Sequence, residues 1–309
     1  MTLLTVTLNA AIDKRYDVTE IAVGQVQRVE RVFFSAGGKG LNASRGALGC
    51  GQRVIATGFL AGFAGQFVAS RLVVEGIEDE FLQVPGETRT CINIIDRQGG
   101  STEFLEPGPA VTAADLEALR QHIEHLLGEV DVVTLSGSAP AGCPVPVYTP
   151  LIVAAQRAGR PVLLDTSGAL LRAELPAAPT VVKPNREELE ALVGYRLPSV
   201  DLLVTAARSI TAQGPEWVVV SLGEEGAIAV SADRAVSARP PRINAVNPVG
   251  CGDVLVGGLA AGLARGLDVA GALPWAVSVS AASAAHPETG RFEFGLAEQL
   301  AAQIQVSRL

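Results

Sequence analysis

Six short apolar runs alternate with helical patterns between residues 3 and 223, and this alternation constrains the fold more than any other feature. The runs lie at 3–8, 53–59, 130–137, 161–168, 179–185 and 217–223. Patterns typical of helices lie between most of them, at 41–48, 65–75, 113–127, 145–158, 187–193 and 202–212. Strands that alternate with helices predict an α/β protein with a doubly wound, mostly parallel sheet flanked by helices.

The pattern changes after residue 223. Residues 226–238 predict a β-hairpin, and apolar helices are expected near 251–266, 269–285 and 295–305. Two earlier segments, 14–34 and 88–105, show the period-two alternation of strands, so they predict a small sheet beside the main one. With 309 residues, 48% of them hydrophobic, the chain suits one large core. We therefore expect a single α/β domain over 1–309, with a small β-sheet lid formed by the two inserted segments.

Charge and cysteine content exclude several functions. The net charge of -8 argues against a nucleic-acid partner, which would favour a basic face. The four cysteines show no paired or metal-ligand spacing, so we expect reduced thiols in a cytoplasmic protein. The N-terminus lacks a basic leader and reaches Asp13 too early for a signal peptide. The longest uncharged run, 269–286, contains Pro274 and is rich in Ala and Ser, which predicts a buried helix and no membrane span.

Most of the predicted strands end in small or polar residues, as in TLNAAID, LLDTSG and VVKPN. In open α/β sheets, ligands bind beyond the carboxyl ends of the strands. These strand ends should therefore line one crevice, and Lys183, which follows the fifth run, should lie in it.

A glycine turn leads into an apolar helix in NPVGCGDVLVGG, residues 247–258. Small residues at a helix N-terminus let several backbone N–H groups bind one anion. Asp253 at this position has two interpretations. It caps the helix, as aspartate often does, or it is a general base for a hydroxyl that attacks a phosphoryl group held by residues 250–252.

A second glycine turn, GGKGLN at 37–42, contains one of only three lysines in the chain. Its spacing matches neither the P-loop nor the dinucleotide-binding motif. Lys39 either neutralises a bound anion or is a solvated charge on an ordinary turn. In KPNREELEAL, residues 183–192, Asn185 and Glu188 are spaced to hold hydrated Mg²⁺ or to form a helix cap, and in isolation the pattern favours the cap.

Together these motifs resemble the ribokinase-like carbohydrate kinases of the phosphofructokinase B type. The similarity runs nearly end to end, through TLNAAID, AGGKGLNASR, GETRTC, TEFLEPGP, LSGSAPAG, LLDTSG, KPNREEL, VVVSLGEEGA and NPVGCGD. The resemblance implies an ATP- and Mg²⁺-dependent kinase with Asp253 as the catalytic base and an anion hole at Gly250, Cys251 and Gly252. It also implies nucleotide phosphate and Mg²⁺ contacts from Lys183, Asn185 and Glu188, nucleotide contacts from Ser221, Gly223 and Gly226, and sugar contacts from Asp13, Gly38, Lys39 and Asn42.

Within that family, Lys39 and Arg89 resemble the clamp for a phosphate already on the sugar, which implies a ketohexose monophosphate as substrate and a 1,6-bisphosphate as product. NPVG, TEFLE and PETGRFE resemble tagatose-6-phosphate kinases more than 1-phosphofructokinases. The alternatives are a 1-phosphofructokinase, a 6-phosphofructokinase, or a sugar-phosphate sensor that lost the chemistry. A dinucleotide-dependent oxidoreductase lacks its glycine motif after the first strand.

Three further expectations concern assembly and single residues. The lids of this family often pair between subunits, so the resemblance implies a homodimer. Cys251 lies at a predicted helix N-terminus, where a thiol pKa is often lowered, which predicts sensitivity to thiol reagents. Asp165 ends the fourth run and is expected to help order the crevice, without a catalytic step.

Overall fold

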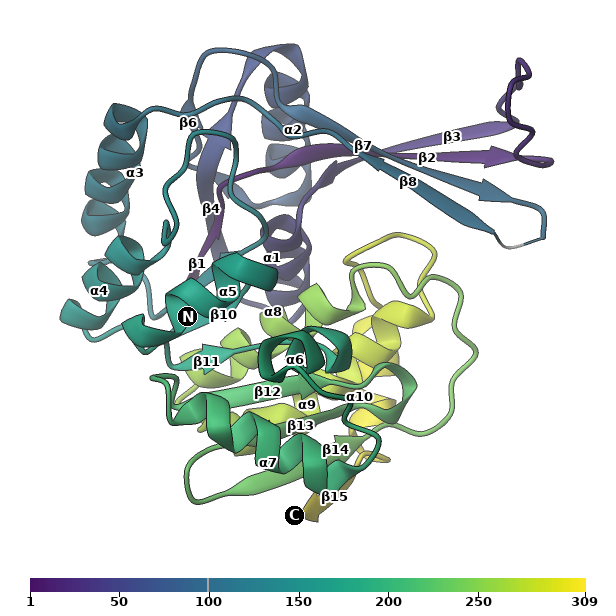
Figure 1. Ribbon diagram of the computed structural model, residues 1–309. Coiled ribbons are helices and arrows are strands. Elements are labelled where there is room, and N and C mark those ends of the chain that lie inside the picture. The colour runs from purple at the N-terminus through teal and green to yellow at the C-terminus, as the bar shows by residue number, and fades with distance from the viewer. Residues whose placement is uncertain (99) are drawn as a thin grey trace.

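The main sheet of the protein carries its strands in the order β15-β14-β13-β12-β11-β10-β9-β1-β4-β5, and β6 pairs with the end of β4. A computed structural model describes residues 1–98 and 100–309 (Figure 1). The parallel part comprises β12 (Trp217–Ser221), β11 (Val181–Val182), β10 (Val162–Asp165), β9 (Val132–Ser136), β1 (Thr2–Thr7), β4 (Arg53–Leu60), β5 (Glu78–Asp79) and β6 (Leu82–Gln83). The antiparallel part comprises β13 (Ala227–Val230), β14 (Ala235–Arg239) and β15 (Gln305–Arg308). The prediction of a mostly parallel sheet is confirmed.

Helices cover both faces of this sheet (Figure 1). One face packs against α3 (Ala113–Leu126), α4 (Thr149–Arg157), α5 (Gly168–Glu174), α6 (Arg186–Val193) and α7 (Val200–Thr211). The other packs against α1 (Lys39–Gly49), α2 (Gly62–Glu75), α8 (Cys251–Ala264) and α9 (Val269–Ala284). A last helix, α10 (Phe294–Ala301), packs on α8 and α9.

Strand β1 shows how the sequence sets these two layers. Its side chains alternate between the faces, so Leu4 and Val6 enter the core under α3 and α4, while Leu3 enters the core under α1 and α8. All three are fully buried. Because both faces are covered, the strand is buried from Leu3 onward, including the polar residues Thr5 and Thr7.

A second sheet has the order β3-β2-β7-β8 and projects away from the main body (Figure 1). Its strands are β2 (Ala11–Val18), β3 (Arg31–Gly37), β7 (Arg89–Asp96) and β8 (Ser101–Leu105). The small sheet expected from 14–34 and 88–105 is therefore present, although β2 begins three residues earlier, at Ala11, and β3 ends at Gly37. Residue 99 of the second segment lies outside the described residues.

The C-terminus departs from the sequence prediction. The last helix ends at Ala301 instead of near 305, and residues 305–308 form β15. This strand pairs with β14, where Val306 lies opposite Ala238. The pairing provides partners for the backbone N–H and C=O groups at the open edge of the hairpin. Within the described residues, no helix is both long and apolar enough to cross a membrane.

Candidate active site

The carboxyl ends of the parallel strands bring the predicted site residues together. Asp165 is the last residue of β10, and Lys183 follows β11 directly. Asn185 forms an isolated bridge with Ser221, the last residue of β12. The N-termini of α1 and α8 meet the same edge, because Lys39 and Asn42 contact groups on β10 and α8.

Asp253 lies in the first turn of α8, and its carboxylate is buried. The cap interpretation is wrong, because the N-cap residue is Gly250, at φ 79°, and no side chain caps this helix. The Oδ2 atom of Asp253 instead accepts a hydrogen bond of 2.9 Å from Nδ2 of Asn42 on α1. The structure therefore leaves this carboxylate available for a function other than capping.

The surroundings of Asp253 favour its protonated form. Burial raises the pKa of Asp253 well above its usual range, and the negative charge of Asp165 raises it further. The positive charges of Lys39 and Lys183 and the hydrogen bond from Asn42 oppose this rise. A carboxylate with a raised pKa is a stronger proton acceptor, as a general base near neutral pH requires.

Asp165 is the centre of a charge cluster that sequence reasoning did not assign. Its side chain is fully buried, and its Oδ1 atom lies 3.1 Å from Nζ of Lys39 and 3.4 Å from Nζ of Lys183. Its Oδ2 atom has no hydrogen-bond partner among the described residues. The one signal in the sequence was its position at the end of an apolar strand, which predicted only that it helps to order the crevice.

The side chain of Lys39 is 36% exposed, but its ammonium group is paired with the buried carboxylate of Asp165, so the alternative of an unpaired, solvated charge is wrong. Burial acts to lower the pKa of Lys39, but the charges of Asp165, Asp253 and Glu188 outweigh burial and raise it. The nearest Glu188 oxygen, Oε1, lies 4.0 Å from Nζ. Lys39 is therefore a cation held inside the crevice. Whether it also contacts a sugar phosphate stays a prediction.

The cap interpretation of Asn185 and Glu188 is confirmed. Asn185 is the N-cap of α6, and its Oδ1 atom accepts a 2.7 Å hydrogen bond from the Glu188 N–H. Glu188 Oε2 accepts a 2.8 Å bond from the Asn185 N–H in return. The other oxygen of Glu188, Oε1, faces Lys39 and is not used by the cap. Within the described residues, no group of three or more His, Cys, Asp and Glu side chains could hold a metal ion.

The turn at Gly250, Cys251 and Gly252 supplies fewer free N–H groups than expected. The Cys251 N–H contacts the Pro248 carbonyl oxygen at 3.4 Å, and the Asp253 N–H donates to Gly250 at 3.0 Å. Gly252 lies beside Lys183, because a Cβ placed on it would be 3.5 Å from Nζ. Gly252 and the Lys183 ammonium group are therefore neighbours at this turn, and the anion hole itself stays a prediction.

Cys251 corrects a second expectation. Burial raises the pKa of its thiol to about 11, and the negative charge of Asp253 acts in the same direction. Its Sγ atom lies 3.8 Å from the carbonyl oxygen of Asn247, at the start of the same turn. The prediction of a lowered pKa was wrong because it considered the helix terminus and not the burial of the sulfur.

A second group of residues lies where the small sheet leaves the main body. Asp13, on β2, fits against Gly37, because a Cβ there would lie 2.1 Å from the Asp13 carboxyl carbon. The Gly38 N–H donates to this carboxylate. Burial raises the pKa of Asp13, and the charges of Arg45 and Arg89 oppose that rise. Asp13, Gly38 and Arg89, all predicted to contact the sugar, are thus neighbours.

The two glycines predicted near the nucleotide shape the turn after β12. Gly223 and Gly226 have φ values of 59° and 87°. A Cβ on Gly226 would lie 2.1 Å from the Ala238 carbonyl oxygen, so glycine is required there for the hairpin to close. Their role toward a nucleotide stays a prediction.

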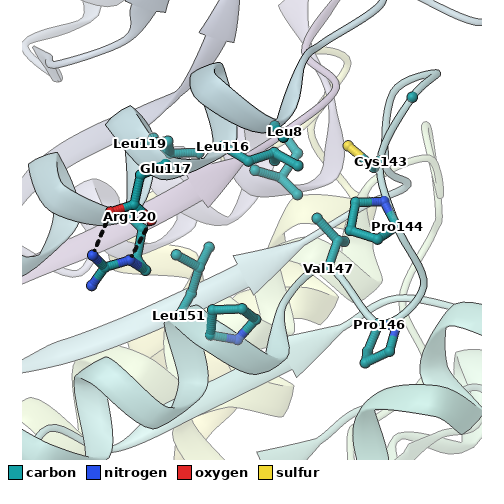
Figure 2. Close-up of a pocket in the computed structure, with 13 residues that line it drawn as sticks. Leu8, Leu116, Glu117, Leu119, Arg120, Cys143, Pro144, Pro146, Val147 and Leu151 are labelled. Atoms are coloured by element: carbon teal, nitrogen blue, oxygen red, sulfur yellow. Dashed lines mark hydrogen bonds and ion pairs between the residues drawn. The ribbon is translucent and has the colours of Figure 1, made fainter.

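Two hollows lie elsewhere among the described residues. One cavity of about 450 Å³ lies between α3, α4 and the loop that precedes α4. Figure 2 shows its apolar lining, which includes Leu116, Leu151 and Cys143. Another, of about 640 Å³, lies between the small sheet and α2. Neither is lined by Asp253, Asp165 or Lys183. We therefore define the candidate site by its converging charges.

Comparisons with known proteins agree with this fold. Residues 2–293 match the family described as pfkB family carbohydrate kinase. A candidate phosphofructokinase from Staphylococcus aureus has a similar structure, with a TM-score of 0.84, 30% identity and coverage of 100% of this chain and 99% of that chain. The tetrameric inhibited form of phosphofructokinase-2 from Escherichia coli has a TM-score of 0.89 and 27% identity, with coverage of 97% of this chain and 98% of that chain. A possible 1-phosphofructokinase from Thermotoga maritima has a TM-score of 0.89 and 26% identity, with coverage of 100% of both chains.

Proposed function

This chain belongs to the pfkB family of carbohydrate kinases, with a ribokinase-like fold, and from that premise we propose that it transfers the γ-phosphoryl group of ATP to a ketohexose monophosphate. The product is the 1,6-bisphosphate. One observation carries the proposal. The buried carboxylate of Asp253 lies at a helix N-terminus and accepts a hydrogen bond from Asn42, while Lys39 and Lys183 meet at the neighbouring Asp165.

In the proposed reaction, Asp253 accepts the proton of the attacking sugar hydroxyl. The hydroxyl oxygen forms a bond to the γ-phosphorus while the bond from that phosphorus to the ADP oxygen breaks. The proton moves to Asp253, and the negative charge leaves on ADP. Positioning and electrostatic stabilisation supply most of the catalysis in such transfers.

The chain offers positive groups for the transferring phosphoryl group. Gly252 lies at the N-terminus of α8, where the helix dipole adds positive potential. The Lys183 ammonium group lies beside it, and Lys39 shares the same carboxylate partner. We propose that Gly252 and Lys183 contact the phosphates of ATP, with Ser221, Gly223 and Gly226 nearer the nucleoside, and that Lys39 contacts the phosphate of the sugar.

The family also implies Mg²⁺. The donors present fit a hydrated ion bound mainly through the nucleotide, because Glu188 Oε1 is outside the cap and Asp165 Oδ2 has no partner among the described residues. Asn185 already accepts the Glu188 N–H, so its contact with the ion is proposed through water. Bound Mg²⁺ would neutralise charge on the ATP phosphates.

The sugar end of the site is proposed at Asp13, Gly38 and Arg89. The Arg89 Nε atom donates to the Asn9 carbonyl oxygen at 3.1 Å, and Nη1 approaches the Glu106 carbonyl oxygen at 3.4 Å. These contacts fix the guanidinium group at the base of the small sheet and leave further N–H groups for a sugar phosphate. Asp13 would accept hydrogen bonds from sugar hydroxyls.

We propose tagatose 6-phosphate as the preferred sugar phosphate. NPVG, TEFLE and PETGRFE support this choice, and 1-phosphofructokinase activity is the first alternative, with 6-phosphofructokinase activity the second. Tagatose and fructose 6-phosphates differ in configuration at one hydroxyl-bearing carbon, so a small change in hydrogen bonding would separate them.

We further propose that the small sheet is a lid over the sugar and that two lids pair in a homodimer. Phe34, Lys14, Ile92 and Phe104 lie in register across its four strands. Asp13 precedes Lys14 and so faces the opposite side, toward the site. Phe34 and Phe104 are 54% and 58% exposed, and a second copy of this lid would cover that apolar face.

The function is tested by coupled ADP release with ATP and Mg²⁺. The sugars compared are tagatose 6-phosphate, fructose 1-phosphate and fructose 6-phosphate, each by kcat/KM. A preference for tagatose 6-phosphate supports the proposal, and a preference for another of the three replaces only the sugar. Binding of a sugar phosphate by the folded protein without ADP release would instead favour the sensor.

A further inference from the structure

The buried residue Arg45 uses its whole guanidinium group within the protein. It lies on α1, one turn after Asn42, and its side chain is 5% exposed. Its Nε and Nη2 atoms donate to Glu75 at 2.7 and 3.3 Å. Nη2 also donates to the Ala36 carbonyl oxygen at 2.6 Å, and Nη1 donates to Asn42 Oδ1 at 2.9 Å.

The contact with Asn42 fixes which way its amide group points. A guanidinium group has only donors, so the amide must present its oxygen to Arg45. The NH₂ group then faces away, toward Asp253, where Nδ2 donates to Oδ2 at 2.9 Å. If the amide turned over, its oxygen would face the carboxylate and its NH₂ group would face the guanidinium group.

The packing around Asn42 leaves little space for another arrangement. A Cβ on Gly250 would lie 3.3 Å from Asn42 Nδ2, and a Cβ on Gly290 would lie 3.2 Å from Oδ1. The amide is thus enclosed between two glycine backbones. Its position is determined by packing, and its orientation by the hydrogen bond from Arg45.

Glu75 holds Arg45 in this position. It is the last residue of α2, and its side chain is only 6% exposed. A carboxylate at the C-terminus of a helix is unfavourable for the helix dipole, so its placement needs another explanation. Its two-point contact with Arg45 provides one, and Arg291 approaches the same carboxylate at 3.6 Å.

We propose that Arg45, held by Glu75, is a positioning residue for the proposed base, because it orients the Asn42 amide so that it donates to Asp253. The inference rests on the proposed function of Asp253. Arg45 touches no reacting atom. It acts through Asn42, whose donated hydrogen bond stabilises the ionised carboxylate and fixes the oxygen that accepts it.

The groups that face Asp253 explain why this orientation matters. Lys39 and Lys183 favour the ionised form, whereas Asp165 and burial oppose it. Glu188 acts on the same cluster through Lys39. In a reversed amide, the oxygen of Asn42 would face the Asp253 carboxylate and repel it, as the charge of Asp165 already does. The pKa of Asp253 would then rise further, and the base would be protonated at higher pH.

The test removes the ion pair as a unit in the full-length protein, as Arg45→Met with Glu75→Leu. Removing both charges avoids an unpaired buried charge, so this variant is more suitable than either single substitution. At saturating sugar phosphate, we expect kcat to fall about 10- to 100-fold. The KM for ATP should change little. In a plot of kcat against pH, the acidic limb, where the rate falls as the base is protonated, should move to higher pH. The matched control is Arg53→Met with Glu78→Leu, an exposed pair, which should leave the limb in place.

Asn42→Ala completes the test. If Arg45 acts through Asn42, adding the ion-pair substitutions to Asn42→Ala should shift the acidic limb no further. A purely structural ion pair would instead lower the activity by the same factor in both backgrounds without moving the limb, and this result would overturn the proposal.

An NMR measurement separates this inference from the kinase proposal. The side-chain NH₂ signals of Asn42, identified by their loss in Asn42→Ala, should shift as Asp253 titrates in the wild-type protein. They should lose that dependence in Arg45→Met/Glu75→Leu. Unchanged behaviour in the ion-pair variant would overturn the positioning role. An absence of ADP release by the wild type would refute only the kinase function, since the NMR result does not depend on turnover.

Discussion

The Lys39 ammonium group lies 3.1 Å from the carboxylate of Asp165, a residue 126 positions further along the chain. Lys183 approaches the same oxygen at 3.4 Å. One fully buried carboxylate therefore holds two cations at the edge of the sheet, and its own charge raises the pKa of Asp253. The effect of the Asp165 charge on the pKa of Asp253 can therefore be measured by removing that charge.

Asp165→Asn should move the acidic limb of the kcat profile to lower pH. The substitution removes a negative charge that raises the pKa of Asp253, so the base stays ionised in more acidic solution. We also expect kcat to fall about 10-fold or more, since both lysines lose their shared partner. Rate profiles from pH 4 to 9 would measure both effects, and a limb that moved to higher pH would contradict the assignment.

Asp253→Asn should lower kcat by about 10²- to 10⁴-fold, because asparagine cannot accept the hydroxyl proton. The KM for ATP and for the sugar phosphate should stay within about threefold of the wild-type values. In the wild type, the rate should fall on acidification at a pH above that of an ordinary aspartate, since burial raises the pKa of Asp253. Steady-state kinetics would check each point, and near-normal turnover by the variant would place the base elsewhere.

Glu188→Gln separates the two roles of Glu188. Glutamine keeps the reciprocal hydrogen bonds of the cap on α6, so the melting temperature should change little. It removes the charge on Oε1, so half-maximal activity should require several-fold more Mg²⁺. Glu190→Gln, on the same helix, is the control, since its carboxylate contacts Arg196. An unchanged Mg²⁺ dependence in Glu188→Gln would rule out the metal role.

Cys251 should react slowly with iodoacetamide at neutral pH. Burial raises the pKa of this thiol to about 11, and it also raises the pKa values of Cys50, Cys91 and Cys143. Alkylation of each site, followed by mass spectrometry over a range of pH, should show rates below that of a free thiol with a pKa of about 8.5. Rapid, selective modification of Cys251 would show instead that the helix terminus dominates.

Phe34→Glu with Phe104→Glu should dissociate the proposed dimer. The two substitutions place charge on the apolar face of the lid, which a second copy is proposed to cover. Sedimentation velocity should show a dimer for the wild type and a monomer for this variant. Val200→Glu is the control, because Val200 is also exposed, at 44%, but lies at the start of α7. Equal assembly states in all three proteins would refute the lid interface.

Much of the fold was accessible from local sequence patterns. Buried runs such as 3–8 and 217–223 predicted the parallel strands because helices cover both faces of the sheet. The alternation in 14–34 and 88–105 predicted the second sheet. The last strand, β15, escaped prediction because its four residues depend on the neighbouring edge of β14 and carry little local signal of their own.

By itself, the sequence determined which chemical groups reach the carboxyl edge of the sheet, because strand ends and glycine turns are local features. The strand pattern placed Lys183 at that edge, and the family resemblance added Asp253, Lys39 and Asn185 to the same site. The tertiary structure alone decided what those groups contact. The pairing of Lys39 with Asp165, the orientation of Asn42 by Arg45 and the raised pKa of Cys251 all depend on burial and on partners distant in sequence. Desolvation and charge pairing act through space, so they appear only when the chain is folded.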